Sequence, residues 1–263
     1  MTSAPETLKA CCASAYASAG ARWLLGPSFH PGGTALTSEL VRALRVGPGE
    51  TVADVASGPG TSALQLARET GCYVIGIDLS EESVAAAAKA AEAAGLGDQV
   101  RFVHGDAEEL PLATATLDGA LSECSLCLFP DKEAAAAELA RVLRPGARLA
   151  LSDVVADGES LPAELRTASA WAACLADARP PEEIAGLLES AGLRVEASER
   201  RDGALAELLD RVEGRLAVAR LVGDRLPDGL GSGVGRWIDL AAKARQALDE
   251  GILGYVVVVA RRP

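Results

Sequence analysis

The sequence predicts an α/β fold built on a doubly wound, mostly parallel sheet with helices on both faces. Two observations lead to this class. Short apolar segments alternate with helical segments from residue 52 to residue 154, as in successive βαβ units. The first apolar segment runs through a Gly-rich turn directly into a helical segment, which is typical of ligand-binding α/β sheets. We expect an N-terminal helical cap, a core and a C-terminal α+β extension that completes the sheet, over residues 1–35, 36–155 and 156–263.

The segments before the Gly-rich turn are helical. Apolar residues at three- and four-residue spacing predict a helix over residues 8–25. Proline and glycine then predict a loop over residues 26–33. A second helix is expected over residues 37–43, with Thr37 as its N-cap.

Strands and helices alternate from there to residue 155. The expected strands are 52–56, 73–78, 100–104, 117–122 and 148–154. The expected helices are 61–69, a long Ala-rich helix capped by Ser80, and 131–143.

Beyond residue 155 the alternation changes. Helices are expected over 161–176, 181–191, 203–221 and 238–249. Strands are expected over 193–198 and 252–260, the last at the edge of the sheet or beside the fifth strand.

Composition narrows the function classes. The chain has 263 residues, of which 49% are hydrophobic and 3% aromatic, so the core must consist mainly of Ala, Leu and Val. A net charge of -12 without a basic cluster argues against nucleic acid and anionic membrane as partners. The polar start and the short apolar run near residues 251–260 lead us to expect no signal peptide and no membrane span, hence a soluble cytoplasmic protein.

The Gly-rich turn indicates the site. Gly58 and Gly60 carry no Cβ, so a ligand can approach the backbone closely, and the first N–H groups of the next helix face the same space. The Gly-Lys-Ser/Thr of a phosphate-binding P-loop is missing, and Ala63 stands at the third position of the dinucleotide fingerprint.

The pattern D-V-A-S-G-P-G-T resembles the first motif of class I S-adenosylmethionine-dependent methyltransferases, D-x-G-x-G-x-G, with Ala56 in place of the first glycine. The turn L-R-P-G-A around Pro145 is similar to the L-x-P-G-G turn of that family. The resemblance covers about residues 35 to 155 and implies a Rossmann-like methyltransferase fold with S-adenosylmethionine as cofactor.

The carboxyl ends of the strands hold acidic residues, and ligands of open parallel sheets bind there. We expect Asp78 to accept the ribose hydroxyls, Asp106 and the Ala107 N–H to contact adenine, and Asp54 with the turn backbone to hold the cationic methionine moiety. The absence of nearby Lys or Arg suits a sulfonium better than a pyrophosphate. The predicted cofactor-binding residues are Asp54, Ala56, Ser57, Gly58, Gly60, Thr61, Asp78, Leu79, Asp106, Ala107, Glu108 and Glu123.

Two cysteine-bearing segments should overhang the methyl-transfer site. S-E-C-S-L-C-L-F-P-D-K, after the fourth strand, and W-A-A-C-L-A-D-A-R are similar to two segments of arsenite methyltransferases. That resemblance implies that Cys124 and Cys174 bind trivalent arsenic as the substrate, since thiolates are soft ligands, with a thiol reductant as a further requirement. The region around residues 24–30 lacks the additional cysteine of those enzymes, which Cys11 and Cys12 of the N-terminal helix would have to replace.

Other acceptors stay open. An organic small molecule would need a proton acceptor, for which His30 and Glu123 are the candidates, with the cysteines only lining the pocket. A third hypothesis is a non-catalytic sensor that uses the cysteines for a soft metal ion. The remaining thiols have a structural alternative, because cysteine often packs as a small apolar side chain; we assign Cys72 to the core.

Overall fold

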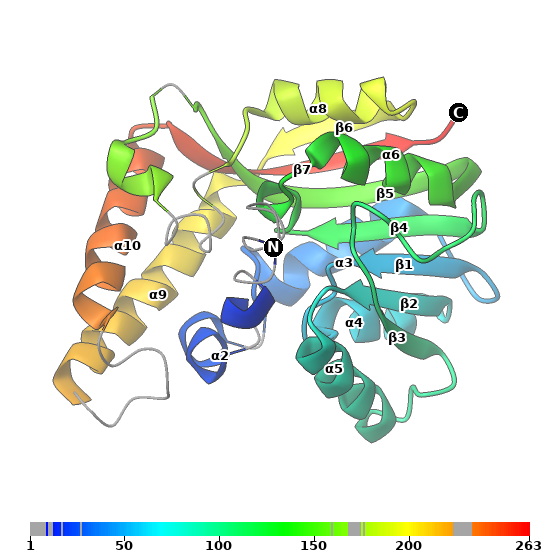
Figure 1. The fold of residues 1–263 in the computed structure, drawn as a ribbon, viewed down its shortest axis with the longest axis horizontal. Helices are drawn as coiled ribbons and strands as arrows, with labels where there is room; N and C mark the ends of the chain where they lie inside the picture. The colour runs from blue at the N-terminus through cyan, green and yellow to red at the C-terminus, as the bar shows by residue number, and fades with distance from the viewer. Residues whose placement is uncertain are drawn as a thin grey trace, which may run out of the picture.

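One seven-stranded sheet organises the described part of the chain (Figure 1). The computed structural model describes residues 9, 13–16, 18–26, 28–158, 160–167, 175, 177–222 and 233–263. The strands lie in the order β3-β2-β1-β4-β5-β7-β6. In chain order they are β1 (Thr51–Val55), β2 (Tyr73–Asp78), β3 (Val100–His104), β4 (Leu117–Glu123), β5 (Leu143–Ala156), β6 (Arg194–Arg200) and β7 (Leu253–Arg261).

Strands β1 to β5 are parallel to one another, and β7 is antiparallel to both β5 and β6. The order reverses between β1 and β4, because β1 lies against β2 on one side and β4 on the other. The predicted fold class is therefore confirmed. The last strand lies beside the fifth, as expected, and β6 covers its other side.

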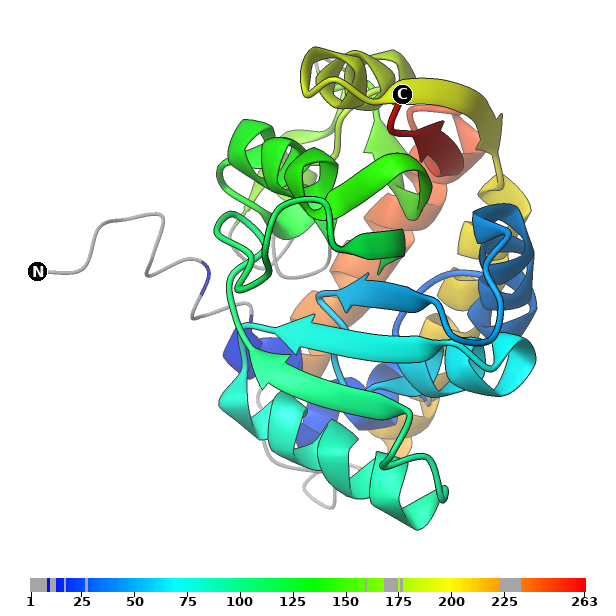
Figure 2. The ribbon, with the colours of Figure 1, turned by 90° about the vertical axis from the view of Figure 1, so that its right-hand side faces the viewer.

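Helices cover both faces of this sheet, as the turned view also shows (Figure 2). On one face lie α3 (Gly33–Leu44), α4 (Thr61–Thr70) and α5 (Glu81–Ala93), and on the other α6 (Lys132–Val142) and α8 (Pro181–Ser190). A third group stands beyond the carboxyl ends of the parallel strands (Figure 1): α2 (Ala19–Leu25), α9 (Asp202–Val222) and α10 (Val234–Asp249). None of the described helices has the length and apolarity needed to cross a bilayer.

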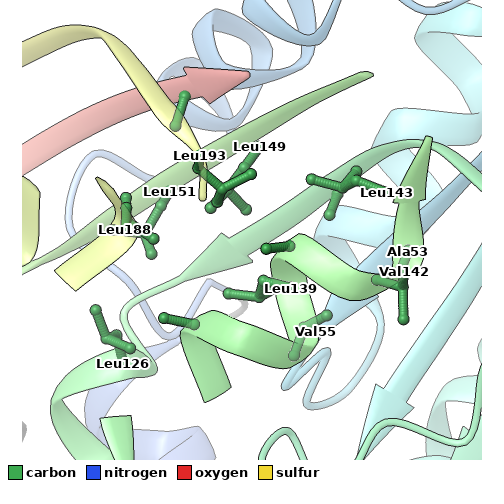
Figure 3. Packing of buried hydrophobic residues seen from close by; sticks show 14 of the residues in the cluster. Ala53, Val55, Leu126, Leu139, Val142, Leu143, Leu149, Leu151, Leu188 and Leu193 are labelled. Carbon is green, nitrogen blue, oxygen red and sulfur yellow. The ribbon is translucent and has the colours of Figure 1, made fainter. Parts of the chain in front are cut away.

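Aliphatic side chains form the core on each face. Leu139 of α6 and Leu188 of α8 pack over Leu149 and Leu151 of the sheet, all of them fully or almost fully buried (Figure 3). On the opposite face Leu40 of α3 belongs to a separate cluster with residues of α4 and α5. These two layers confirm that small and branched aliphatic residues, rather than aromatic ones, fill the interior.

Three predicted helix boundaries were wrong. A helix over 8–25 is interrupted at Ser18, because the Ser18 hydroxyl accepts a hydrogen bond from the Ala21 N–H and starts a new helix, α2. Thr37 lies inside α3, which begins at Gly33 after the left-handed Gly32. Within 161–176 the described part holds a short 3-10 helix, η2 (Ala163–Arg166), while residues 168–174 and 176 lie outside the described residues.

Gly60 is expected to be far less replaceable than its neighbour Gly58. Both have positive φ angles, but a Cβ on Gly60 would lie 2.6 Å from Phe102 Cζ, whereas one on Gly58 would meet nothing within 4 Å. Gly60→Ala therefore adds overpacking to left-handed strain and should lower the free energy of unfolding by about 2–4 kcal/mol. Gly58→Ala carries only the strain, about 1–2 kcal/mol. Denaturant unfolding of both variants checks this; equal losses would contradict it.

Candidate active site

The parallel strands bring three carboxylates to one edge of the sheet. Asp54 lies in β1, Asp78 ends β2 and Glu123 ends β4, and all three line one cavity of about 150 Å³. The cavity lies where the strand order reverses, between β1 and β4. Ligands of doubly wound sheets bind at such a point. Of the predicted cofactor-binding residues, all line this cavity except Gly60 and Glu108.

Asp78 holds the Gly-rich turn in place. Its Oδ2 accepts a hydrogen bond from the Gly58 N–H (2.7 Å), and its Oδ1 accepts one from the Ser80 N–H (2.9 Å). Burial raises the pKa of this carboxyl, although both backbone N–H groups favour its ionised form. Since each carboxylate oxygen has a second lone pair, Asp78 can still accept hydroxyl groups from the cavity side.

Ala56 explains how the turn does without its first glycine. Its φ of 60° lies in the left-handed region, which the family pattern normally gives to glycine. Alanine adopts this conformation at a cost of about 1–2 kcal/mol. The backbone path is thus kept, and strain is stored directly beside the cavity.

Two buried polar atoms in the cavity wall have no protein partner. They are Oδ2 of Asp54 and Oγ of Ser57, both of which belong to side chains that line the cavity. Burial raises the pKa of Asp54 well above its usual range, and the nearby carboxylates of Glu123 and Asp78 raise it further. An anionic group in such a place calls for a cationic ligand with hydrogen-bond donors.

Lys9 lines the same cavity, although the sequence led us to expect no lysine or arginine near the cofactor. Its Nζ lies 2.7 Å from Asp106 Oδ2 and also pairs with Glu108. Asp106 Oδ1 accepts the Glu108 N–H (2.9 Å), and Glu108 in addition accepts the Asp131 N–H. Asp106 and Ala107 line the cavity, whereas Glu108 is engaged with Lys9 and Asp131. The sequence reasoning missed Lys9, which lies 97 residues away from Asp106.

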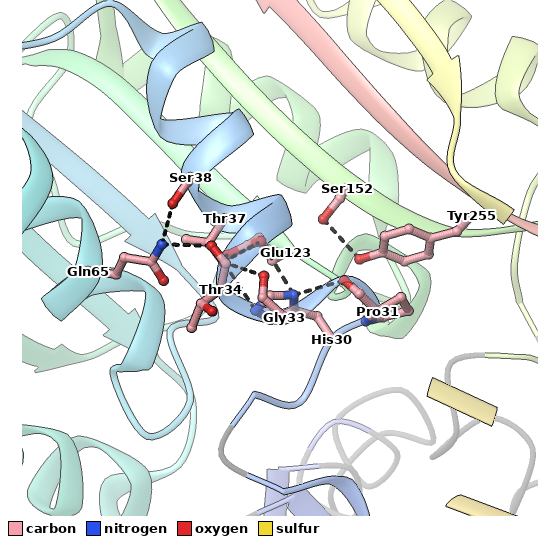
Figure 4. A network of polar contacts seen from close by, with 10 residues as sticks. All are labelled: His30, Pro31, Gly33, Thr34, Thr37, Ser38, Gln65, Glu123, Ser152 and Tyr255. Carbon is pink, nitrogen blue, oxygen red and sulfur yellow. Dashed lines mark hydrogen bonds and ion pairs between the residues drawn. The ribbon is translucent and has the colours of Figure 1, made fainter. Parts of the chain in front are cut away.

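His30, Thr37 and Glu123 form a hydrogen-bonded group beside the methionine end of the predicted cofactor site (Figure 4). His30 is 6% exposed; its Nδ1 lies 3.2 Å from the Pro31 carbonyl and 3.5 Å from Glu123 Oε1. Its Nε2 lies 3.4 Å from the Thr37 hydroxyl, which is 3.2 Å from both Glu123 oxygens. In the neutral tautomer in which Nδ1–H donates to the Pro31 carbonyl, Nε2 carries a lone pair that faces the Thr37 hydroxyl.

Cys124 lies at a junction of two cavities. Together with Tyr16 and Phe29 it lines both the cavity just described and a second one of about 410 Å³. Its φ of 53° is unusual for a side chain with a Cβ, and its N–H donates to the Ser152 carbonyl (2.7 Å). We call Tyr16, Phe29 and Cys124 the neck. Phe29 was missed in the sequence, although it directly precedes His30.

The other thiols do not reach the neck within the described structure. Cys72 is fully buried in the core, and burial raises the pKa of its thiol. Cys127 is also buried, and its N–H donates to Asp153 (3.0 Å). Among the residues that the structure describes, no group of three or more His, Cys, Asp or Glu side chains could hold a metal ion. Cys11, Cys12 and Cys174 lie outside the described residues.

Lys132 fixes the segment that follows β4. Its buried Nζ donates to the Phe129 carbonyl (2.9 Å) and contacts Asp177 (2.5 Å), which also pairs with Arg179. Phe129 lines the cofactor cavity. This ion pair therefore ties one wall of the cavity to the chain that precedes α8. Asp177 and Arg179 thus form more than a surface pair.

Known proteins are similar to this chain in sequence. Residues 52–146 match the methyltransferase domain family. The chain is 30% identical over 247 residues to 27-O-demethylrifamycin SV methyltransferase of Amycolatopsis mediterranei, covering 88% of this chain and 84% of that protein. It belongs to the class I S-adenosylmethionine-dependent methyltransferases. The predicted family is confirmed.

The matches to two further relatives cover a smaller share of those proteins. An O-methyltransferase of Pyrenophora dematioidea is 38% identical over 122 residues, 46% of each chain, so the match spans about half of that relative. An arsenite methyltransferase of Halobacterium salinarum is 34% identical over 149 residues, 55% of this chain and 37% of that one.

A solved structure shows the same fold. Phosphoethanolamine N-methyltransferase 2 of Haemonchus contortus, in complex with phosphomonomethylethanolamine and S-adenosylhomocysteine, superposes with a TM-score of 0.80 at 19% identity, covering 100% of this chain and 61% of that one. S-adenosylmethionine is the cofactor of this methyltransferase. The cationic methionine end of that molecule fits against Asp54 Oδ2 and Ser57 Oγ, the two buried oxygens of the cavity wall that have no protein partner.

Proposed function

We propose that this methyltransferase transfers the methyl group to a hydroxyl oxygen of a small organic molecule. One observation carries the proposal: the three neck residues line both the cofactor cavity and a larger cavity whose walls are mainly apolar, with aliphatic and aromatic side chains. Such a cavity suits an organic acceptor, because apolar surface removed from water contributes about 25 cal/mol per Å². The proposal is supported by relatives that are named O-methyltransferases.

A side chain of the enzyme accepts the proton of the acceptor hydroxyl in this proposal. When bound, S-adenosylmethionine supplies an electrophilic methyl group, and the acceptor hydroxyl must lose its proton. We assign the role of general base to Nε2 of His30, which lines the cofactor cavity close to the neck. Glu123, 3.5 Å from Nδ1, stabilises the positive charge that His30 then carries. Thr37 orients both groups through its hydroxyl.

The remaining cavity residues are assigned to the cofactor. Asp54 and Ser57 would hold the cationic end of S-adenosylmethionine, and Asp78 its ribose hydroxyls. Asp106 and the Ala107 N–H would contact adenine, next to Lys9. Gly60 acts indirectly, since it lets the first turn of α4 pack against Phe102.

Trivalent arsenic is the second candidate acceptor. A specific observation favours it: the thiol of Cys124 lies at the neck, where the methyl group must pass. The similarity to an arsenite methyltransferase also supports it. Arsenic would need further thiolates, for which Cys174, Cys11 and Cys12 remain the candidates.

Replacing Cys124 by serine distinguishes the hydroxyl acceptor from the arsenic acceptor. The variant keeps the size of the side chain but loses the soft thiolate ligand. Under the O-methylation proposal, methyl transfer to hydroxyl compounds should change by less than about tenfold, or 1.4 kcal/mol in the barrier. Under the arsenic alternative, methylated arsenicals formed from arsenite and a thiol reductant should disappear.

The measurement is mass spectrometry of methyl ethers from a panel of hydroxyl compounds, beside arsenic speciation, for both proteins. Cys72→Ser serves as a matched control, because that thiol is buried far from the neck in the core. Methylated arsenic from the unaltered protein, lost in Cys124→Ser, together with no methyl ether would overturn the O-methylation proposal.

A further inference from the structure

The second cavity is distinct from the cofactor cavity and shares the three neck residues with it. Its described walls come from α2, α9 and α10 and from the ends of β5 and β7. Its volume of about 410 Å³ falls in the range of about 300–1,000 Å³ that is usual for small-molecule sites. Leu205, Leu209, Leu240 and Ala244 are among its aliphatic side chains.

No Asp, Glu, Lys, Arg or His side chain lines this cavity in the described part of the chain. The polar side chains on its wall are few, and one of them, Ser18, is already engaged: its hydroxyl caps α2 and donates to the Ala15 carbonyl (2.7 Å). The cofactor cavity, by contrast, is lined by four carboxylates and one lysine: Asp54, Asp78, Asp106, Glu123 and Lys9.

The walls are held in place by arginines that lie outside the cavity lining. Arg215 of α9 donates to the Trp23 and Leu24 carbonyls, both at 2.9 Å, and so fixes the carboxyl end of α2 against α9. Arg245 of α10 bonds to the Ala206 carbonyl of α9 at 3.2 Å. Three separate helices are thus tied into one apolar chamber.

We infer that this chamber holds the uncharged, mainly hydrocarbon body of the acceptor, with the reactive hydroxyl at the neck. The inference rests on the proposed function for the position of the hydroxyl. A carboxylate or ammonium group inside the chamber would lose its water without gaining a charged partner among the described lining residues, so this lining disfavours charged acceptors. The substrate class is therefore a neutral, hydrophobic hydroxyl compound rather than an amino acid, a phosphate ester or an amine.

A pair of fluorescent probes tests the charge requirement. Methyl 6-hydroxy-2-naphthoate and 6-hydroxy-2-naphthoate have the same hydroxyl and ring system and differ in the charge at the opposite end. With S-adenosylhomocysteine at saturation, the neutral ester should bind at least about tenfold more tightly. Equal affinity, or tighter binding of the carboxylate, would overturn the inference.

Tryptophan substitutions on α10 locate the bound probe. Ala244 lines the chamber, so Ala244→Trp should fill it and weaken binding of the ester by at least about tenfold. Ala242 on the same helix is exposed, and Ala242→Trp should bind the ester as the unaltered protein does. Ala241→Leu is a milder filling variant, used if Ala244→Trp fails to bind S-adenosylhomocysteine and hence to fold.

Binding and turnover measurements distinguish failure of this inference from failure of the O-methylation proposal. If the ester binds in the chamber but no acceptor of any class is converted to a methyl ether, the inference stands and the O-methylation proposal falls. If hydroxyl compounds are methylated while the filling variants and Ala242→Trp have equal affinities and rates, the chamber is not the acceptor site.

Discussion

His30→Ala should lower kcat for methylation of a hydroxyl compound by about 10²- to 10⁴-fold, the usual contribution of a general base. The reason is the proposed role of the imidazole, whose Nδ1 faces Pro31 and Glu123 and whose Nε2 carries the lone pair in the tautomer that donates to Pro31. Affinity for S-adenosylmethionine should change little, since Asp54 and Asp78 provide the charged contacts assigned to the cofactor. Steady-state kinetics with calorimetric titration of the cofactor measures both.

A second variant separates a base from a packing residue. His30→Asn, which retains a polar planar side chain, serves as the structural control and should also be slow. A loss of less than about tenfold in both variants would rule His30 out as the base.

Asp54→Asn should weaken binding of S-adenosylmethionine by about 10- to 150-fold, corresponding to the 1.5–3 kcal/mol of a hydrogen bond to a charged group. Asp54 is fully buried, and its Oδ2 has no partner in the protein. Burial, helped by the charges of Glu123 and Asp78, raises the pKa of this carboxyl well above its usual range. The cationic cofactor favours the ionised carboxylate, so binding should release a proton and tighten as the pH rises.

Whereas cofactor binding should tighten as the pH rises, the free energy of unfolding of the cofactor-free protein should fall. With a pKa raised in the folded state, the folded protein binds more protons than the unfolded chain between the two pKa values. The cofactor-free protein therefore loses free energy of unfolding as the pH rises from the unfolded pKa through the folded one. Asp54→Asn should remove this loss and leave the cofactor-free protein more stable at alkaline pH.

Calorimetry in two buffers of equal pH but different ionisation enthalpy measures the released proton, and thermal unfolding across pH measures the stability. Ser57→Ala is the matched control: it removes the other unpartnered polar atom of the cavity wall but no charge, so proton release should persist. Equal proton release by the Asn variant and the unaltered protein would contradict the role of Asp54.

Most of the cofactor site followed from local rules. Parallel strands place their carboxyl ends at one edge, so Asp54, Asp78 and Glu123 could be brought together from the alternation of strands and helices alone. The turn glycines were recognisable because few residues adopt positive φ angles. Glu108 shows the limit of such reasoning, because its place beside Asp106 in the chain does not say that it pairs with Lys9.

The amino-acid order by itself determined the fold class and the strand ends that form the site, since these depend on periodicity and turns within a few residues. The cofactor was predicted from the resemblance of the Gly-rich turn to a family motif. The tertiary structure alone decided which side chains line both cavities and what forms the second one. The neck consists of Tyr16, Phe29 and Cys124, which come from three separate segments. The apolar chamber forms only when α2, α9 and α10 pack together. Contacts between residues so far apart depend on how whole helices pack, and no local pattern encodes them.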